Sequence, residues 1–197
     1  MTGQINVNKI AARSGNTITI NSGDKISGAA GSIVAPGHIL QVKYHQQTTS
    51  FTQTGISAVT DTPITNMQVD IIPSSTSSVI KLEASMMFES ASQAWSMMYF
   101  FYRNTTKLGN TDSDRSNRRT GIMIPSQSYW ASDNDSTPEN VHLTWYDTPQ
   151  STSNITYKLG FNQTGTDNLF VNRTITDTNN SGYERGVSFI SATEIAQ

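Results

Sequence analysis

Three histidines would be the starting point for acid–base catalysis in this chain, because histidine is the side chain that titrates near neutral pH. They are His38, His45 and His142. No His-x-x-x-His spacing brings two of them together, and a hydrolase needs a base held by an orienting partner. The chain has no cysteine, which excludes thiol catalysis and cysteine-based zinc sites. We therefore expect no catalytic residues and no enzymatic activity.

Two clusters of carboxylate and amide oxygens could hold a calcium ion. The first is Asp112-Ser113-Asp114 and the second is Asp133-Asn134-Asp135. Neither follows the spacing of an EF-hand loop, and Asp and Asn in loops mainly make turns. We expect neither a metal site nor a cofactor within one chain. Ions on the axis of a trimer remain an open alternative.

Arginines in the middle of the chain could bind an anionic ligand. Arg115, Arg118 and Arg119 lie in one polar region and could grip an acidic glycan or a lipid head group. In the alternative interpretation they form a solvated loop and pair locally with Asp112 and Asp114.

An aromatic pair further along the chain is the best candidate for contact with a sugar. Tyr129 and Trp130 are followed by Asp133. An aromatic face stacks on the C–H groups of a sugar ring, while a carboxylate accepts hydrogen bonds from hydroxyls. Alternatively, Trp130 anchors a subunit interface. The predicted ligand-binding residues are Tyr129, Trp130, Asp133, Arg115, Arg118 and Arg119.

Short strand-like runs, separated by turns rich in Asn, Thr, Ser, Asp and Gly, must position these side chains. The pattern predicts strands at 39–44, 55–59, 67–72, 79–88, 120–124, 142–146, 154–161, 169–175 and 187–195. The polar turn 73–78 lies between two alternating runs and predicts a hairpin. Residues 83–102 also fit helical spacing, but we favour two strands broken near 89–94. The series indicates an all-β antiparallel sandwich, jelly-roll-like in type.

Residues 1–37 differ from the rest of the chain. They contain no aromatic residue, and their apolar residues stand singly among small and polar ones. The Gly- and Ala-rich stretch that ends this region predicts a hinge to a head domain at 38–197. One interpretation is a flexible leader that a parent assembly orders. The other is an intertwined β segment around a symmetry axis, where identical isoleucines from several chains meet.

Composition limits the partners of the chain. Charged residues make up 14%, against about 25% in typical domains. With a pI near 5.9 and no basic stripe, nucleic acid is not an expected partner. No apolar run is long enough to cross a bilayer, and Met1–Ile10 has no signal-peptide pattern. The low apolar content, 35%, predicts that several copies share a core.

Residues 39–42 read Ile-Leu-Gln-Val, and residues 71–80 read Ile-x-Pro-Ser-Ser-x-Ser-Ser-x-Ile. Further motifs follow in order: Phe101-Tyr102-Arg103-Asn104, Leu108-Gly109, Trp145-Tyr146-Asp147-Thr148-Pro149, Thr156-Tyr157, Val171-Asn172-Arg173, Ser188-Phe189-Ile190 and Thr193-Glu194-Ile195. Over about residues 38–197 this series resembles small fibre-like structural proteins of tailed bacteriophages, which are common in phages of marine bacteria and cyanobacteria.

The resemblance implies an all-β head domain, a homotrimer and a place on the virion surface after assembly in the host cytoplasm. Residues 1–37 then resemble a segment that docks to the tail or capsid and winds as a trimer. Its expected contact residues are Ile5, Val7, Ile10, Ile18 and Ile20.

The function that the resemblance implies is a short tail fibre or spike that attaches the particle to a glycan or protein of the host surface. The alternative is a capsid decoration or cement protein, or a head fibre, that stabilises the shell. A glycan-degrading enzyme would need two carboxylates in an apolar cleft, which the sequence does not indicate. Expected partners are other copies of the chain and other virion proteins, without nucleic acid and without membrane insertion.

Overall fold

The computed structural model describes residues 35–91, 96–109, 116–126 and 136–197, together with residues 10, 19, 22 and 23. The chain divides into two units, Met1–Ile33 and Val34–Gln197, and every strand among the described residues belongs to the second unit. Of the predicted docking residues, Ile10 is described and its side chain is exposed. The others lie outside the described residues: Ile5, Val7, Ile18 and Ile20.

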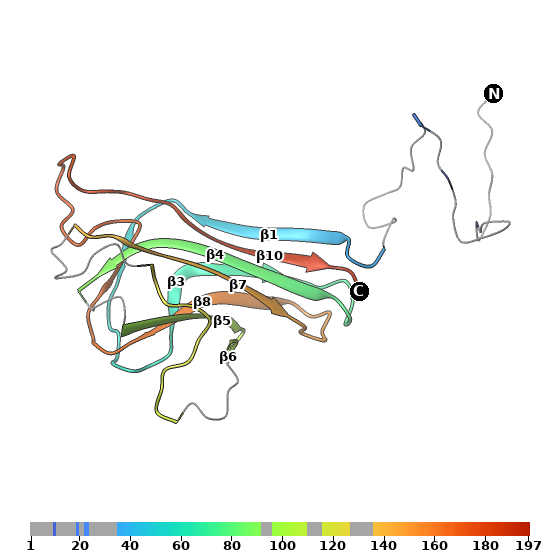
Figure 1. Ribbon diagram of the computed structural model, residues 1–197, viewed down its shortest axis with the longest axis horizontal. Coiled ribbons are helices and arrows are strands. Elements are labelled where there is room, and N and C mark those ends of the chain that lie inside the picture. The colour runs from blue at the N-terminus through green and yellow to red at the C-terminus, as the bar shows by residue number, and fades with distance from the viewer. Residues whose placement is uncertain are drawn as a thin grey trace. The chain divides into compact units, whose positions relative to one another are not determined.

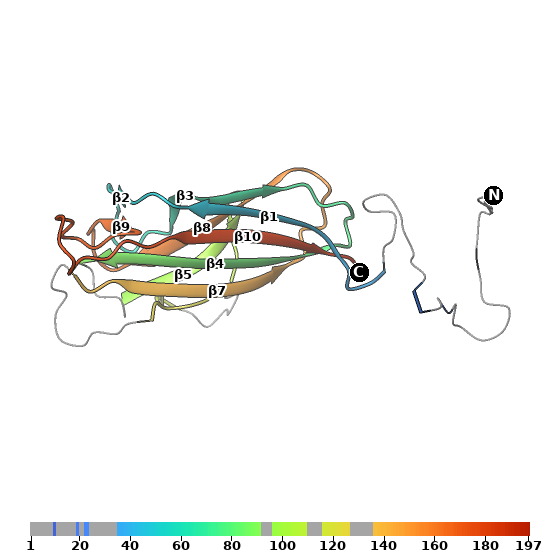
Figure 2. The ribbon, with the colours of Figure 1, turned by 90° about the horizontal axis from the view of Figure 1, so that it is seen from above.

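The larger sheet is built around one long strand. Its members are β1 (Ile39–Gln47), β2 (Phe51–Gln53), β4 (Val79–Ser90), β7 (Glu139–Asp147), β9 (Leu169–Val171) and β10 (Ser188–Ile195). β7 pairs along one edge of β4, while β10 and β9 follow one another along the other edge. Because β1 pairs with β10 and β2 with β9, the sheet ends at β1 on one side and at β7 on the other (Figure 2).

The smaller sheet packs against the larger one and completes a sandwich (Figure 1). It consists of β3 (Thr62–Ile71), β8 (Ile155–Gln163), β5 (Met97–Arg103) and β6 (Thr106–Lys107), in this order. All ladders between these strands, in both sheets, are antiparallel. Within the described ranges no helix is long and apolar enough to cross a bilayer. The prediction of an all-β antiparallel sandwich is confirmed.

The interior of the sandwich is closed by a single chain. The inward side of β4 is fully buried, as its alternating pattern predicts: Ile80, Leu82, Ala84, Met86 and Phe88. The Phe88 ring lies 5.4 Å from the Tyr99 ring, which lies 6.0 Å from the Phe161 ring of the facing sheet. The described residues of one chain thus bury an interior between the two sheets. That several copies share a core stays a prediction.

Three details of the predicted strand pattern are also wrong. The run 55–59 is not a strand, because Gly55 and Val59 have positive φ angles of 70° and 53° that turn the backbone. The run 120–124 is reduced to one isolated bridge between Met123 and Tyr99. The run 169–175 ends as a strand at Val171. The break between two strands near 89–94 is confirmed, since β4 ends at Ser90.

The turn at 73–78 does not form the predicted hairpin, because β3 and β4 belong to different sheets. The carboxylate of Glu194, fully buried on β10, holds this crossing turn. It accepts hydrogen bonds from Ser74 N (2.7 Å), Ser74 Oγ (2.6 Å) and Ser78 Oγ (2.6 Å). Gln41 of β1 donates a further bond of 2.6 Å. The serines that suggest a solvated hairpin turn thus bind a buried charge.

Candidate functional site

We call one end of the sandwich the proximal end. The first strand, β1, starts there and the last strand, β10, ends there. Gly37 N donates to the carbonyl of Ala196 over 2.8 Å, and Ala196 N donates to the carbonyl of His38 over 2.9 Å. Ile39, the first residue of β1, pairs with Ile195, the last residue of β10 (Figure 1). The N-terminal start of this unit therefore lies at this end. The connections at this end are 72–78, 104–105 and 148–154.

The opposite, distal end carries the longest fully described connection, 172–187. The segments 48–50, 54–61, 136–138 and 164–168 lie at the same end, which Figure 1 shows away from the C-terminus. The strand register places them there, because the first residue of β10, Ser188, pairs with the last residue of β1, Gln47. A sandwich can vary such loops without disturbing its sheets, and binding residues commonly lie on them.

Buried polar side chains fix the distal loops to the sheet. Glu89, fully buried near the end of β4, accepts hydrogen bonds from Thr137 N and Ile175 N, each 2.7 Å long. Asn172, with a φ of 59°, donates from Nδ2 to the carbonyl of Gln47 over 2.6 Å. Because buried bonds of this kind are lost only at considerable cost, the beginning of the loop 172–187 is fixed to the sheet.

The loop 172–187 forms a polar hollow of about 340 Å³ at the distal end. Arg185 donates from Nε to Asp177 over 2.8 Å and from Nη1 to Ser50 Oγ over 2.7 Å, which ties this loop to the one after β1. The ring of Tyr183 and the amides of Asn179 and Asn180 complete its lining. An aromatic face beside carboxylate, amide and guanidinium groups can bind a sugar or another polar ligand.

This hollow was not among the predicted sites, although the sequence carries a signal for it. Asp, Asn, Tyr and Arg residues gather in one segment between two strands, the same combination that predicts sugar contact at Tyr129, Trp130 and Asp133. Those three residues and Arg115 lie outside the described residues.

Arg118 and Arg119 are described, and they border a second hollow of about 410 Å³. Val59, Met97, Met98 and Ile124 supply its apolar lining. Guanidinium groups beside apolar side chains suit a ligand that carries both an anionic group and an apolar portion. The two arginines therefore line the same hollow. That Tyr129 and Trp130 lie near them stays a prediction.

The histidines lie on different sides of the molecule. His142 pairs with Ser85 on the outer face of the larger sheet, whereas His45 pairs with the inward-facing Ile190. The two acidic clusters that were considered for calcium, 112–114 and 133–135, lie outside the described residues. Among the residues that are described, no group of three His, Asp or Glu side chains is arranged to hold a metal ion.

Two inner tyrosines are held in the neutral, protonated form by their surroundings. Burial, followed by the nearby Glu139 charge, raises the pKa of Tyr99 well above its ordinary value. Burial also raises the pKa of Tyr157, with a further contribution from its hydrogen bond of 2.7 Å to Asp147. Arg103 binds the same carboxylate over 2.9 Å. This network joins the two sheets near the proximal end and is structural in character.

Comparison with known proteins gives no family for the chain. No family model matches the sequence, and no curated protein is similar to it. Among solved structures, the chain is similar to the infectious bursal disease virus VP2 subviral particle, with 14% identity and a TM-score of 0.32 over 87% of this chain and 46% of the other. The Gt and Gx strain structures of the same virus give 14% identity and TM-scores of 0.31 and 0.30, covering 88% of this chain and 47% of each. The chain thus spans about half the length of these viral structures.

Proposed function

We propose that the chain is a structural protein of a virus particle, which serves as a short tail fibre or spike and attaches the particle to its host. The observation that carries the proposal is the difference between the two ends of the sandwich. The N-terminal start of the sandwich lies at the proximal end, where Gly37 and Ala196 are hydrogen bonded. The distal end presents the polar hollow of loop 172–187 on a rigid support.

A protein fixed to a particle at one end can bind a host surface with the other. The motifs that resemble tailed-phage fibre proteins support the same function. As a homotrimer, each fibre would present three copies of the distal end, and several fibres would act together. Multivalent binding of this kind raises avidity by about 10²–10⁴ without any new contact.

A competition assay tests this function. An excess of the purified chain should reduce adsorption of the virus to its host cells, because it occupies the receptors. The variant Tyr183→Ala, which removes the aromatic face of the distal hollow, should compete about tenfold less well. Tyr44→Ala is the matched control, since Tyr44 is equally aromatic but lies on β1. Unchanged adsorption in the presence of saturating wild-type protein would contradict an attachment role.

One surface favours the capsid decoration protein as a second candidate. The outer face of the larger sheet exposes apolar side chains across its edge strands: Ile39, Val42, Tyr44 and Tyr146. Such a face could clamp neighbouring shell subunits. Under this alternative, particles without the protein would adsorb normally and would rupture at a lower temperature.

A further inference from the structure

The strand β3 forms an open edge of the smaller sheet, because it pairs with β8 and with no other strand among the described residues. Its neighbour across the sandwich is β1, the edge strand of the larger sheet. No backbone hydrogen bond joins the two strands within the described part of the chain. Unpaired backbone groups along such an edge are a template for another strand.

Glutamine side chains occupy both ends of this edge. At one end, Gln53 donates from Nε2 to the carbonyl of Pro63 and accepts from Thr65 N, each over 2.9 Å. At the other end, Gln41 donates from Nε2 to the carbonyl of Ile72 over 2.7 Å. At the two ends of β3, the side-chain amides of Gln53 and Gln41 thus make the hydrogen bonds that the backbone of a partner strand would make. The stretch between them, Asn66–Ile71, remains open for about six residues of an added strand.

A local bulge shapes the open stretch. Pro63 pairs with Gly160 and Gln68 pairs with Lys158, so four residues of β3 face a single residue of β8. Asn66, within this bulge, has a φ of 63°. Bulges bend a strand and often occur at sheet edges and beside binding sites. Beyond the bulge, Gln68–Ile71 is regular and keeps its pairing with β8.

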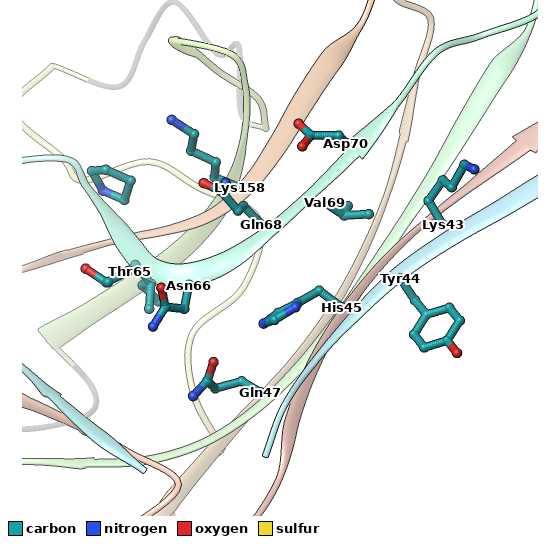
Figure 3. Close-up of a pocket in the computed structure, with 12 residues that line it drawn as sticks. Lys43, Tyr44, His45, Gln47, Thr65, Asn66, Gln68, Val69, Asp70 and Lys158 are labelled. Carbon is teal, nitrogen blue, oxygen red and sulfur yellow. The ribbon is translucent and has the colours of Figure 1, made fainter. Parts of the chain in front are cut away.

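A groove of about 860 Å³ follows the open stretch, with side chains of β1 along one wall (Figure 3). Lys43, His45 and Gln47 alternate along β1 on the side that faces the interior. Lys43 makes no ion pair among the described residues. His45 points toward β3 in Figure 3, and its Nε2 atom is buried without a hydrogen-bond partner in the described part of the chain. This wall therefore offers positive charge and an unused polar atom.

The groove suits an extended peptide better than a sugar. Sugar sites combine polar groups with an aromatic wall, but the ring of Tyr44, the one aromatic side chain in the lining, points away from the groove (Figure 3). Two strand edges with unpaired backbone groups provide what a peptide in β conformation needs.

We propose that the free edge of β3 binds an extended acidic peptide from another protein by strand addition, with acidic side chains at alternate positions facing Lys43 and His45 of β1. An added strand directs successive side chains to opposite faces, so one set meets the β1 wall. The other set lies beside the exposed Asp70 and beside Lys158, so this side favours neither charge. This site is independent of the attachment role, because a fibre and a decoration protein could both dock in this way.

Selection from a library of random displayed peptides on the immobilised full-length chain tests the proposal. We expect enriched sequences to carry Asp or Glu at alternate positions and to lack proline. A resynthesised peptide should protect backbone amides of β3 from hydrogen exchange when it binds. Lys43→Glu should weaken it about tenfold, since attraction becomes repulsion. Lys81→Glu, the same change on the outer face of the same sheet, should leave its affinity unchanged.

Exchanging the charges of the peptide and of residue 43 distinguishes a direct contact between them from an indirect effect of the substitution on the fold. A peptide with lysine in place of its acidic residues should bind Lys43→Glu better than it binds the wild type. The proposal is overturned by a selection that enriches no acidic pattern, or by a bound peptide that protects amides elsewhere. Binding of polygalacturonate in place of peptides would show a glycan site. A concentration-dependent dimer that protects β3 would show a second copy of the chain as the occupant. Either result also overturns the proposal.

Discussion

Replacing Phe88 with alanine is expected to lower the free energy of unfolding by about 3–5 kcal/mol. The Phe88 side chain is fully buried on β4 and contacts the Tyr99 ring of the facing sheet at 5.4 Å. Its removal would leave a cavity between the sheets, and domains of this kind have only about 5–15 kcal/mol of stability in total. Urea unfolding followed by tryptophan fluorescence would measure the change.

The matched control is Tyr44→Ala, because this side chain is 70% exposed on the outer face of the larger sheet. We expect it to change stability by less than about 0.5 kcal/mol. If the two variants had equal stability, Phe88 would not be buried between the two sheets, and the described packing of the core would be contradicted.

Replacing Glu194 with glutamine is expected to cost about 3 kcal/mol at neutral pH, because hydrogen bonds to a buried charge are lost or weakened. Ser74 and Ser78 donate to its Oε1 atom, so the crossing turn from β3 to β4 depends on this carboxylate. Glu184→Gln, in an exposed part of the distal loop, is the matched control and should leave stability unchanged.

The contribution of Glu194 to the free energy of unfolding should decrease as the pH falls. Burial alone would raise its pKa, but the bonds from Ser74, Ser78 and Gln41 together hold the pKa below the ordinary value of 4.5. A carboxyl group whose pKa is lower in the folded state stabilises the fold above its unfolded pKa. That contribution is lost as the pH falls below 4.5 and through the folded pKa. Unfolding curves from pH 7 down to pH 3 should therefore show the wild type approaching Glu194→Gln; a constant gap would contradict this mechanism.

The sequence predicted the strands that have a regular alternation of apolar and polar residues. β4 is the clearest case, with every second residue from Ile80 to Phe88 buried. The hairpin at 73–78 could not be rejected in this way, because periodicity shows which face of a strand is buried and not which sheet it joins. The pairing of β3 with β8, and of β4 with β7, β9 and β10, identifies the turn as a crossing between sheets.

The candidate sites were harder to predict for a similar reason. Asp177 and Arg185 could be noticed as a polar cluster, but their link to Ser50 depends on how β1 and β10 pair. The groove at β3 has still less signal in the sequence, since Lys43, His45 and Gln47 of its lining come from another strand, β1. Single side chains of these types appear in any polar strand.

Labelling of intact particles tests the proposed place of the chain on a virion most directly. Antibody fragments raised against the distal loop 172–187 should decorate purified particles in electron micrographs, in groups of three at each position. The fragments should also block adsorption to host cells. Purified infectious particles that contain no copy of this chain, or that bind none of these fragments, would contradict the proposed function.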